Sequence, residues 1–322
     1  MGKTIRQLQS GLTIGNVKLG VRAGVTGSVR QEVHDGDTIV VRSKLDDNFS
    51  VRFLGIDTPE ISFKPPTSNS FLGIGREEWK LFLQDPFGSH LPPFSSQLDP
   101  ALENHITGIS GPDTASNHIH HARKAEDELE SLVDSDMADL GQNKDSFEFF
   151  LTFSKEVMDG YGRFLCFINR NQPNPTTPSQ RPLSYNERLL ELGTASPYFI
   201  WPNMSPFGPL SKINPADLVP ATFRNIASSD SRLSTARGFV SSARSNRLGI
   251  FNSANPLLMQ PFELRFLAGR NPPHRWVIDL SKNDHTLIKP QNYFTIPNLE
   301  DRLYIPSEYV PLFVEAGWQR QP

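Results

Sequence analysis

Residues 34–60 read HDGDTIVVRSKLDDNFSVRFLGIDTPE, and this stretch decides the fold. It contains two runs of β-branched and aromatic residues, Thr38–Val41 and Phe49–Leu54, whose composition favours strands. The turn-forming sequence LDDN separates them, so we expect an antiparallel pair. Such a pair brings Asp37, just before the first strand, and Asp57, just after the second, to the same end of a sheet.

Two carboxylates at one end of a sheet are candidate ligands for a hard divalent cation. Oxygen ligands suit calcium better than zinc here, because His34 is the one neighbouring residue of the type that zinc prefers. Glu60 follows Asp57 by three residues and could hold or deprotonate a water molecule beside that cation. Arg52 keeps its proton and can hold a phosphate through two parallel hydrogen bonds. Together these groups predict phosphodiester hydrolysis.

Each acidic motif also has a purely structural interpretation. An Asp-Gly-Asp sequence is most often a turn, and Asp-Thr-Pro-Glu is often only the start of a helix, with proline in its first turn. The functional interpretation therefore depends on the motifs and the arginines occurring together in one chain.

The combination resembles the staphylococcal nuclease (thermonuclease) family. The family's Asp-Gly-Asp-Thr turn, its arginine and its Asp-Thr-Pro-Glu motif match residues 35–38, Arg52 and residues 57–60, in the family's order. Residues 161–163, Tyr-Gly-Arg, are similar to the element that supplies the family's second arginine. The resemblance implies an OB-type barrel of five strands with three helices, an α+β fold.

The resemblance also implies how metal and substrate are held. Calcium would be bound directly by Asp37 and Asp57 and by the carbonyl oxygen of Thr58. Tyr161 and Tyr198 would contact the substrate, and Tyr198 would stack on a nucleobase or help to hold a phosphate. A ring stacks on any base, so such a contact tolerates different sequences.

The implied chemistry is hydrolysis of DNA or RNA with little sequence preference. Glu60 would handle the attacking water, while Arg52 and Arg163 would neutralise the phosphate. The expected protein is a calcium-dependent endonuclease or phosphodiesterase that leaves 3′-phosphates. The alternative is a catalytically inactive module that binds nucleic acid or protein, since OB barrels commonly bind single strands or peptides without chemistry. We favour the enzyme because the chain retains every ligand and arginine.

Composition sets the outer limits of the prediction. With 322 residues, 37% of them hydrophobic, the chain can form one large domain or two ordinary ones. Its single cysteine, Cys166, excludes an internal disulfide framework and a cysteine-rich zinc site. We see no signal peptide and no membrane-spanning run, so we expect a cytoplasmic protein without a membrane partner.

The charge of the chain is unevenly distributed. A net charge of −3 and a pI near 6.3 do not indicate a nucleic-acid binder, for which a basic domain is expected. Residues 99–159, however, hold 14 acidic and 4 basic residues, a balance of −10, which leaves +7 for the rest of the chain. The acidic block can therefore conceal an otherwise basic surface.

The resemblance covers residues 24–252, with Gly27–His34 expected as the first strand. It is interrupted by an insertion at 65–111, which begins beside the predicted site and would form either a lid or a surface loop. Residues 253–322 are predicted to be a small α+β appendage that docks on the barrel, mediates self-association or recruits a protein partner. Its expected strands are Phe262–Leu267, Arg275–Leu280, Tyr293–Ile296 and Leu303–Ile305.

Apolar periodicity and capping residues predict three helices in the matched region. His118 and His121 share a face of the first, but no third ligand is evident, so we interpret them as part of a solvated helix start. The three helices are expected from Asp113 or Thr114 to Leu140, from Ser184 to Gly193, and from Ser229 or Asp230 to Gly249.

Overall fold

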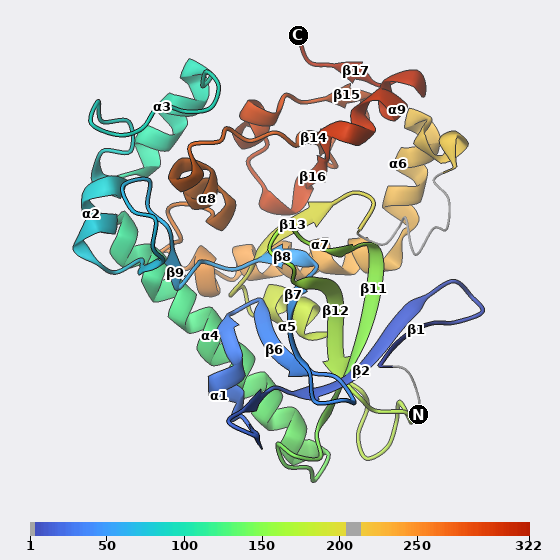
Figure 1. The fold of residues 1–322 in the computed structure, drawn as a ribbon. Coiled ribbons are helices and arrows are strands. Elements are labelled where there is room, and N and C mark those ends of the chain that lie inside the picture. The colour runs from blue at the N-terminus through green and yellow to red at the C-terminus, as the bar shows by residue number, and fades with distance from the viewer. Residues whose placement is uncertain (1–3, 204–213) are drawn as a thin grey trace.

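A closed barrel of strands forms the lower part of the molecule in Figure 1. The computed structural model describes residues 4–203 and 214–322. Its barrel strands are β2 (Thr13–Leu19), β6 (Thr38–Arg42), β7 (Asn48–Phe53), β11 (Glu148–Met158) and β12 (Phe164–Arg170). They are hydrogen-bonded in the order β2-β11-β12-β7-β6, and β2 also pairs with β6, which closes the ring. An α+β fold built on a five-stranded barrel, compatible with an OB-fold, is thus confirmed.

The predicted hairpin is present as β6 and β7, paired antiparallel with Thr38 opposite Arg52. Asp46, in the turn between them, has φ +64°, a conformation that aspartate tolerates better than most residues. After β7 the chain turns sharply at Gly55, whose φ of +77° favours glycine, and enters β8 (Gly55–Asp57). Asp57 therefore lies at the same end of the barrel as Asp37, which immediately precedes β6.

The prediction of a first strand at Gly27–His34 is wrong. This segment forms α1 (Val29–Glu32) and then β5 (Val33–Asp35), because the Ser28 N–H donates to the Gln31 side chain at 2.9 Å and starts a helical turn. The first barrel strand is β2, which lies before the predicted start at residue 24. Its Gly15 does not disrupt the strand, because it lies opposite Leu151 of β11 and packs against that side chain.

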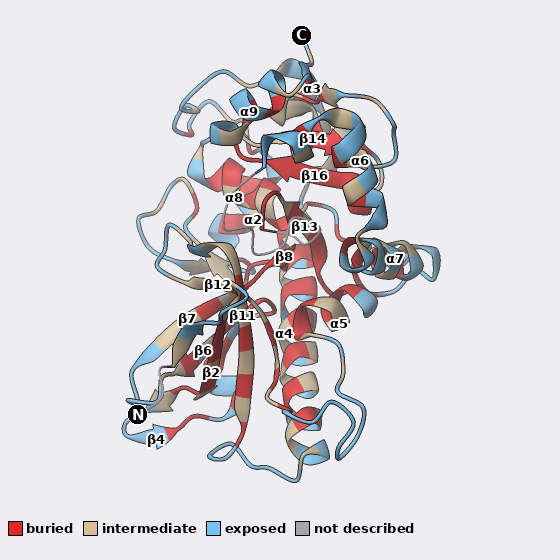
Figure 2. Ribbon diagram, turned by 90° about the vertical axis from the view of Figure 1, so that its right-hand side faces the viewer, coloured by how far each residue is buried: buried red, intermediate tan, exposed pale blue. Residues whose placement is uncertain are grey.

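The three predicted helices are confirmed as α4 (Thr114–Asp139), α5 (Tyr185–Glu191) and α7 (Ser231–Ser245). Ser184 and Glu187 form the predicted capping box of α5, and the Asp230 carboxylate accepts from the Leu233 N–H at 2.7 Å to cap α7. Helix α4 runs along the barrel and carries a line of buried side chains (Figure 2). This line supplies one wall of the main core.

Residues 253–322 pack directly against the barrel region. A second sheet has the order β14-β16-β13-β8, so C-terminal strands extend the strand that leaves the barrel (Figure 1). The new strands are β13 (Ser196–Ile200), β14 (Trp276–Asp279) and β16 (Arg302–Ile305). The predictions of strands at Arg275–Leu280 and Leu303–Ile305 are confirmed.

Two other predictions for this region are wrong. Phe262–Leu267 lies in a helix, α8 (Pro261–Gly269), and Tyr293–Ile296 lies mostly in the 3₁₀ helix η3 (Pro290–Thr295). The sequence of α8 alternates as a strand would, but proline begins it and the Gln260 N–H donates to Glu263 at 2.6 Å, which is a helix start.

The insertion at 65–111 is folded and contains α2 (Glu77–Gln84) and α3 (Pro100–Ile109). Trp79 and Leu102 of these helices share a hydrophobic cluster with Leu264 of α8, so the insertion supports the C-terminal region. The remaining elements connect or flank these layers. They are β1 (Ile5–Gln7), β3 (Val21–Arg22), β4 (Val25–Thr26), β9 (Ser62–Phe63), β10 (Leu72–Gly73), η1 (Pro215–Leu218), α6 (Pro220–Ser229), η2 (Gly249–Phe251), β15 (Thr286–Leu287), η4 (Leu299–Asp301), η5 (Ser307–Tyr309), α9 (Val310–Glu315) and β17 (Gln319–Arg320).

Candidate functional site

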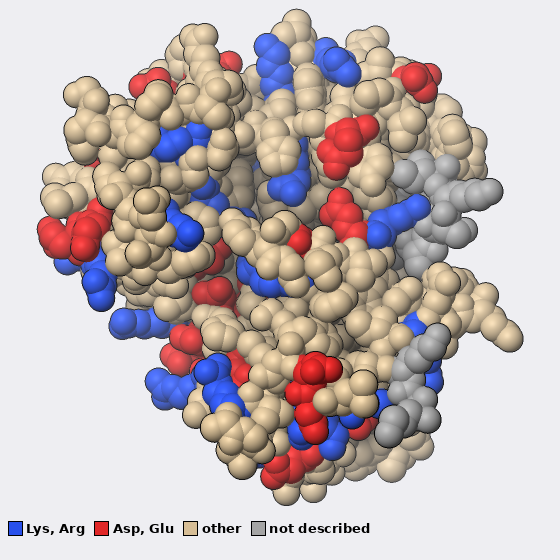
Figure 3. Space-filling view, viewed as in Figure 1, with Lys and Arg blue, Asp and Glu red and all other residues tan. Residues whose placement is uncertain are grey.

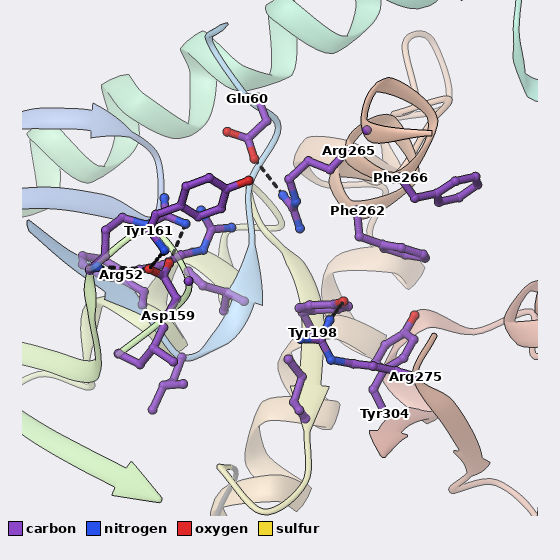
Figure 4. A pocket seen from close by; sticks show the side chains of 18 of the residues that line it. Arg52, Glu60, Asp159, Tyr161, Tyr198, Phe262, Arg265, Phe266, Arg275 and Tyr304 are labelled. Carbon is purple, nitrogen blue, oxygen red and sulfur yellow. Dashed lines mark hydrogen bonds and ion pairs between the residues drawn. The ribbon is translucent and has the colours of Figure 1, made fainter. Parts of the chain in front are cut away.

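A cavity of about 880 Å³ lies where the end of the barrel meets the C-terminal region. Figure 4 shows Arg52 and Tyr161 on the barrel side, and Tyr198 and Arg275 on the opposite side. Of the described residues of the insertion, Phe71 alone lines this cavity. The insertion therefore reaches the rim and leaves most of the wall to the barrel and the C-terminal region.

The two predicted acidic motifs meet beside this cavity: Asp35, Arg52 and Glu60 line it, whereas Asp37, Asp57 and Thr58 do not. Asp37 and Asp57 are buried, and one nitrogen of Arg52, Nη2, lies 2.9 Å from Asp37 Oδ2 and 2.6 Å from Asp57 Oδ1. The Thr58 N–H donates to Asp37 Oδ2 at 2.9 Å. The hairpin thus brings together both aspartates, Thr58 and Arg52, as the sequence predicts.

One residue of this cluster, Arg265 of α8, is not predicted from the sequence. Its Nη1 and Nη2 lie 2.9 and 2.8 Å from the two carboxylate oxygens of Asp57, and Nη1 also lies 2.7 Å from Glu60 Oε1 (Figure 4). The available signal was a single arginine in the largely apolar sequence PFELRFLAG. That signal is weak because the alternating residues of this segment predict a strand, in a region expected to be separate from the barrel.

Glu60 is buried beside this arginine. Burial raises the pKa of its carboxyl, while Arg265 and Arg52 oppose that shift. Its backbone N–H donates to Nε2 of His118 at 3.0 Å. The interpretation of His118 as part of a solvated helix start is therefore wrong: the ring is buried, and burial lowers its pKa to about 3, so it is neutral and accepts this bond.

Asp35 is a second acidic residue of the site whose pKa its surroundings raise. Its Oδ1 accepts from the Ile61 N–H at 3.2 Å. Burial, followed by the charges of Glu60 and Asp37, raises the pKa of Asp35 to about 8. Asp35 is therefore mostly protonated at neutral pH, which reduces the negative charge in the cluster.

Arg163 reaches the same cavity from the turn before β12. Asp159 organises this turn: its Oδ1 accepts from the Tyr161 and Arg163 N–H groups at 2.9 and 3.0 Å. Its Oδ2 lies 2.7 Å from Arg163 Nη2. Nη1 of Arg163 is 3.5 Å from the hydroxyl of Thr38, the residue paired with Arg52 in the hairpin. The fold thus brings both predicted arginines to one end of the barrel.

The two predicted substrate-binding tyrosines occupy opposite sides of the cavity. Tyr161 is 70% exposed, and the Arg163 guanidinium lies 5.3 Å from the centre of its ring. Tyr198 is half-buried, and its ring stacks on Phe262 with centroids 5.6 Å apart. Its hydroxyl accepts from Arg275 Nη1 at 2.7 Å. Tyr161 is free to meet a ligand at the rim, whereas Tyr198 is packed into the wall.

The predicted calcium ligands do not fit a calcium ion in this arrangement. Asp37 accepts from Thr38 through Oδ1 and from Thr58 through Oδ2, and both oxygens of Asp57 accept from arginines. The guanidinium of Arg265 bridges Asp57 and Glu60, so it occupies one side of the predicted calcium ligand Asp57. Among the described residues, no group of three or more histidine, cysteine or acidic side chains is arranged to hold a metal ion. Carboxylate oxygens are ligands that calcium prefers, but here the positively charged guanidinium of Arg265 already holds those of Asp57 and Glu60.

The face around the cavity carries both signs of charge. Figure 3 shows lysine and arginine interspersed with aspartate and glutamate on this side of the molecule. The cavity itself also carries both signs. Its lining includes four arginines, Arg52, Arg163, Arg265 and Arg275, and four acidic residues, Asp35, Glu60, Glu156 and Asp159. The formal charges of these lining residues therefore balance, and an anionic ligand would depend on local contacts with the arginines.

Comparisons with known proteins do not assign this chain to a family. Neither a scan against models of protein families nor a search of curated proteins finds a match to this chain. No helix of the described residues has the length and apolar character needed to cross a membrane.

Proposed function

We propose that this protein is a phosphodiesterase of the staphylococcal nuclease type that hydrolyses DNA or RNA. One observation carries the proposal: Arg52, Glu60 and Arg163, from motifs more than a hundred residues apart in sequence, line a single cavity at one end of a five-stranded barrel. Two guanidinium groups can stabilise the charge that develops on a phosphate, and a buried carboxylate can act as the general base in phosphodiester hydrolysis.

In the proposed reaction the substrate phosphate lies between Arg52 and Arg163. Glu60 takes a proton from a water molecule while the oxygen of that water bonds to phosphorus. The bond between phosphorus and the 5′-oxygen, on the opposite side of the phosphorus, breaks. The 5′-oxygen then takes a proton from solvent, which leaves a 3′-phosphate and a 5′-hydroxyl. The two arginines stabilise the charge that develops on the phosphoryl oxygens.

The proposed reaction involves the ion pairs of the site. Arg265 holds Glu60 through Oε1, so the proton goes to Oε2, or to Oε1 once this ion pair has opened. Arg163 must divide its donors between Asp159 and the phosphate. A bound phosphate compensates for the partners that it displaces, because it also accepts charge-assisted hydrogen bonds from guanidinium. Calcium belongs to the proposal through the family resemblance alone, and the steps above use only this chain's residues.

A second candidate is a module that binds nucleic acid without cleaving it. The observation that favours it is Arg265, which neutralises Asp57 and Glu60 together. A carboxylate that stays in this ion pair is a weaker base toward water, while the arginines of the cavity could still bind phosphates.

Cleavage of end-labelled single-stranded DNA and RNA by the purified chain tests the proposal. Parallel reactions contain calcium, magnesium or a chelator, and Glu60→Gln serves as a nearly isosteric inactive control. Products with the wild type and none with Glu60→Gln would support the enzyme. Retarded mobility of either strand without cleavage would favour the binding module.

A further inference from the structure

The C-terminal region places an arginine in the cavity that the proposed reaction does not use. Arg275 immediately precedes β14 and lines the wall opposite Arg52 (Figure 4). Its Nη1 donates to the hydroxyl of Tyr198 at 2.7 Å, and its guanidinium lies 5.5 Å from the centre of that ring. Two strands of one sheet, β13 and β14 on either side of β16, hold these two residues in place.

The charge of Arg275 is the least compensated in the cavity. The other three arginines of the lining each form an ion pair: Arg52 with Asp37, Arg163 with Asp159, and Arg265 with Asp57. Within residues 4–203 and 214–322, no ion pair with a carboxylate is found for Arg275. Its Nε is also buried without a hydrogen-bond partner in this part of the chain.

A half-buried guanidinium without an anion is costly to maintain, because its donors are withdrawn from water and meet no charged partner. Such a group is suited to an anion that arrives from solvent. A phosphate suits it especially well, since a guanidinium offers parallel donors that match two phosphate oxygens. Its neighbour, the Tyr198 hydroxyl, can then donate to one of the same two non-bridging oxygens, because it accepts from Arg275 and its own proton is available.

We propose that Arg275 and the Tyr198 hydroxyl form a second phosphate-binding position, which holds a phosphate of the same nucleic-acid strand next to the one that is cleaved. This inference rests on the proposed function, because it assigns the ligand as a strand with successive phosphates. The cavity would thus bind a strand across its width, with the scissile phosphate on the barrel side and its neighbour on the C-terminal side. The region at 253–322 then contributes directly to substrate binding.

The test is the salt dependence of binding to a fluorescently labelled single-stranded DNA octamer, measured by anisotropy in a chelator. For single-stranded nucleic acid, the logarithm of the binding constant falls linearly with the logarithm of the salt concentration. Each phosphate that the protein neutralises makes this slope steeper by about 0.7. We expect Arg275→Gln to weaken binding several-fold and to make the slope shallower by about that amount. Arg275→Lys, which keeps the charge, should keep the slope. Arg123→Gln, a change at an exposed arginine of α4, is the matched control.

A ligand with one phosphate separates the two positions. The affinity for thymidine 3′-monophosphate should change little in Arg275→Gln. Its single phosphate can bind to Arg52 and Arg163 on the barrel side, which this substitution leaves in place. An octamer slope and affinity equal to those of the wild type in Arg275→Gln would overturn the second position and leave the proposed function intact. Absence of octamer binding by the wild-type chain would overturn both.

Discussion

Arg265 holds both carboxylate oxygens of Asp57, at 2.9 and 2.8 Å, from a position 208 residues further along the chain. The same guanidinium reaches Glu60 at 2.7 Å. A buried acidic cluster that the barrel forms at one end is therefore neutralised by a helix from the other end of the sequence. The two regions depend on each other through this contact.

Loss of this arginine should destabilise the protein. In Arg265→Gln two buried carboxylates are left without this charged partner, and removal of one member of a buried ion pair typically costs about 3–5 kcal/mol. Urea unfolding monitored by tryptophan fluorescence measures the free energy of unfolding, with Arg123→Gln as a surface control. Equal stability of Arg265→Gln and the wild type would show that the ion pair contributes nothing to the fold.

The same substitution should change calcium affinity. In the wild type a calcium ion must displace the Arg265 guanidinium from Asp57 and Glu60, so we expect weak binding by calorimetry. In Arg265→Gln the competing guanidinium is gone from Glu60 and from one side of Asp57, although Arg52 still holds Asp57 Oδ1. We therefore expect tighter binding and a larger rise in melting temperature with added calcium. Addition of Asp37→Asn should remove the gain in affinity. Identical calcium affinities in the wild type and Arg265→Gln would contradict competition between the two cations.

Arg163 should matter for turnover more than for metal binding. It contacts Asp159 and Thr38 and none of the predicted metal ligands. Arg163→Ala should therefore lower kcat by about 10²–10³, the usual loss when one donor to the transition state is removed. Calorimetry on the same variant should give calcium affinity close to that of the wild type. Parallel losses in both quantities would assign Arg163 to the metal site instead.

Asp35 should make stability depend on pH with a defined sign. Its pKa is raised to about 8 in the folded state from about 4 in the unfolded chain, so between these values only the folded state holds the proton. Its contribution to stability is thus fully present near pH 4 and is lost as pH rises toward 8. The loss approaches about 1.4 kcal/mol per pH unit.

Urea unfolding between pH 5 and 9 measures this contribution as the difference between the wild type and Asp35→Asn. The variant should become more stable relative to the wild type as pH rises through this window. His118, whose lowered pKa acts in the opposite direction, is present in both proteins and cancels in the comparison. A difference that does not change with pH would mean that Asp35 is ionised in the folded protein.

Local signals predicted the barrel end of the site well. The hairpin follows from β-branched residues and a turn sequence, and its antiparallel register alone brings Asp37, Asp57 and Arg52 together. Capping residues such as Ser184 and Asp230 marked helix starts that are present in the structure. In these cases local sequence and tertiary packing favour the same structure.

Predictions failed where packing between distant segments decides the outcome. A glycine such as Gly15 locally disfavours a strand, but in β2 it lies opposite Leu151 within the barrel. The alternating residues of α8 suit both a strand and a helix, and its packing against the insertion favours the helix. Arg265 could not be assigned to the site because no local pattern indicates which carboxylate a distant guanidinium meets.

The most direct test of the proposed reaction is cleavage of single-stranded DNA in water enriched in oxygen-18, followed by mass spectrometry of the products. Attack of water on phosphorus with departure of the 5′-oxygen predicts new 3′-phosphates that each carry one heavy oxygen, beside unlabelled 5′-hydroxyl ends. Glu60→Gln and Arg163→Ala should yield almost none of this product. New 5′-phosphate ends, or no cleavage by the wild-type chain under any metal condition, would contradict the proposal.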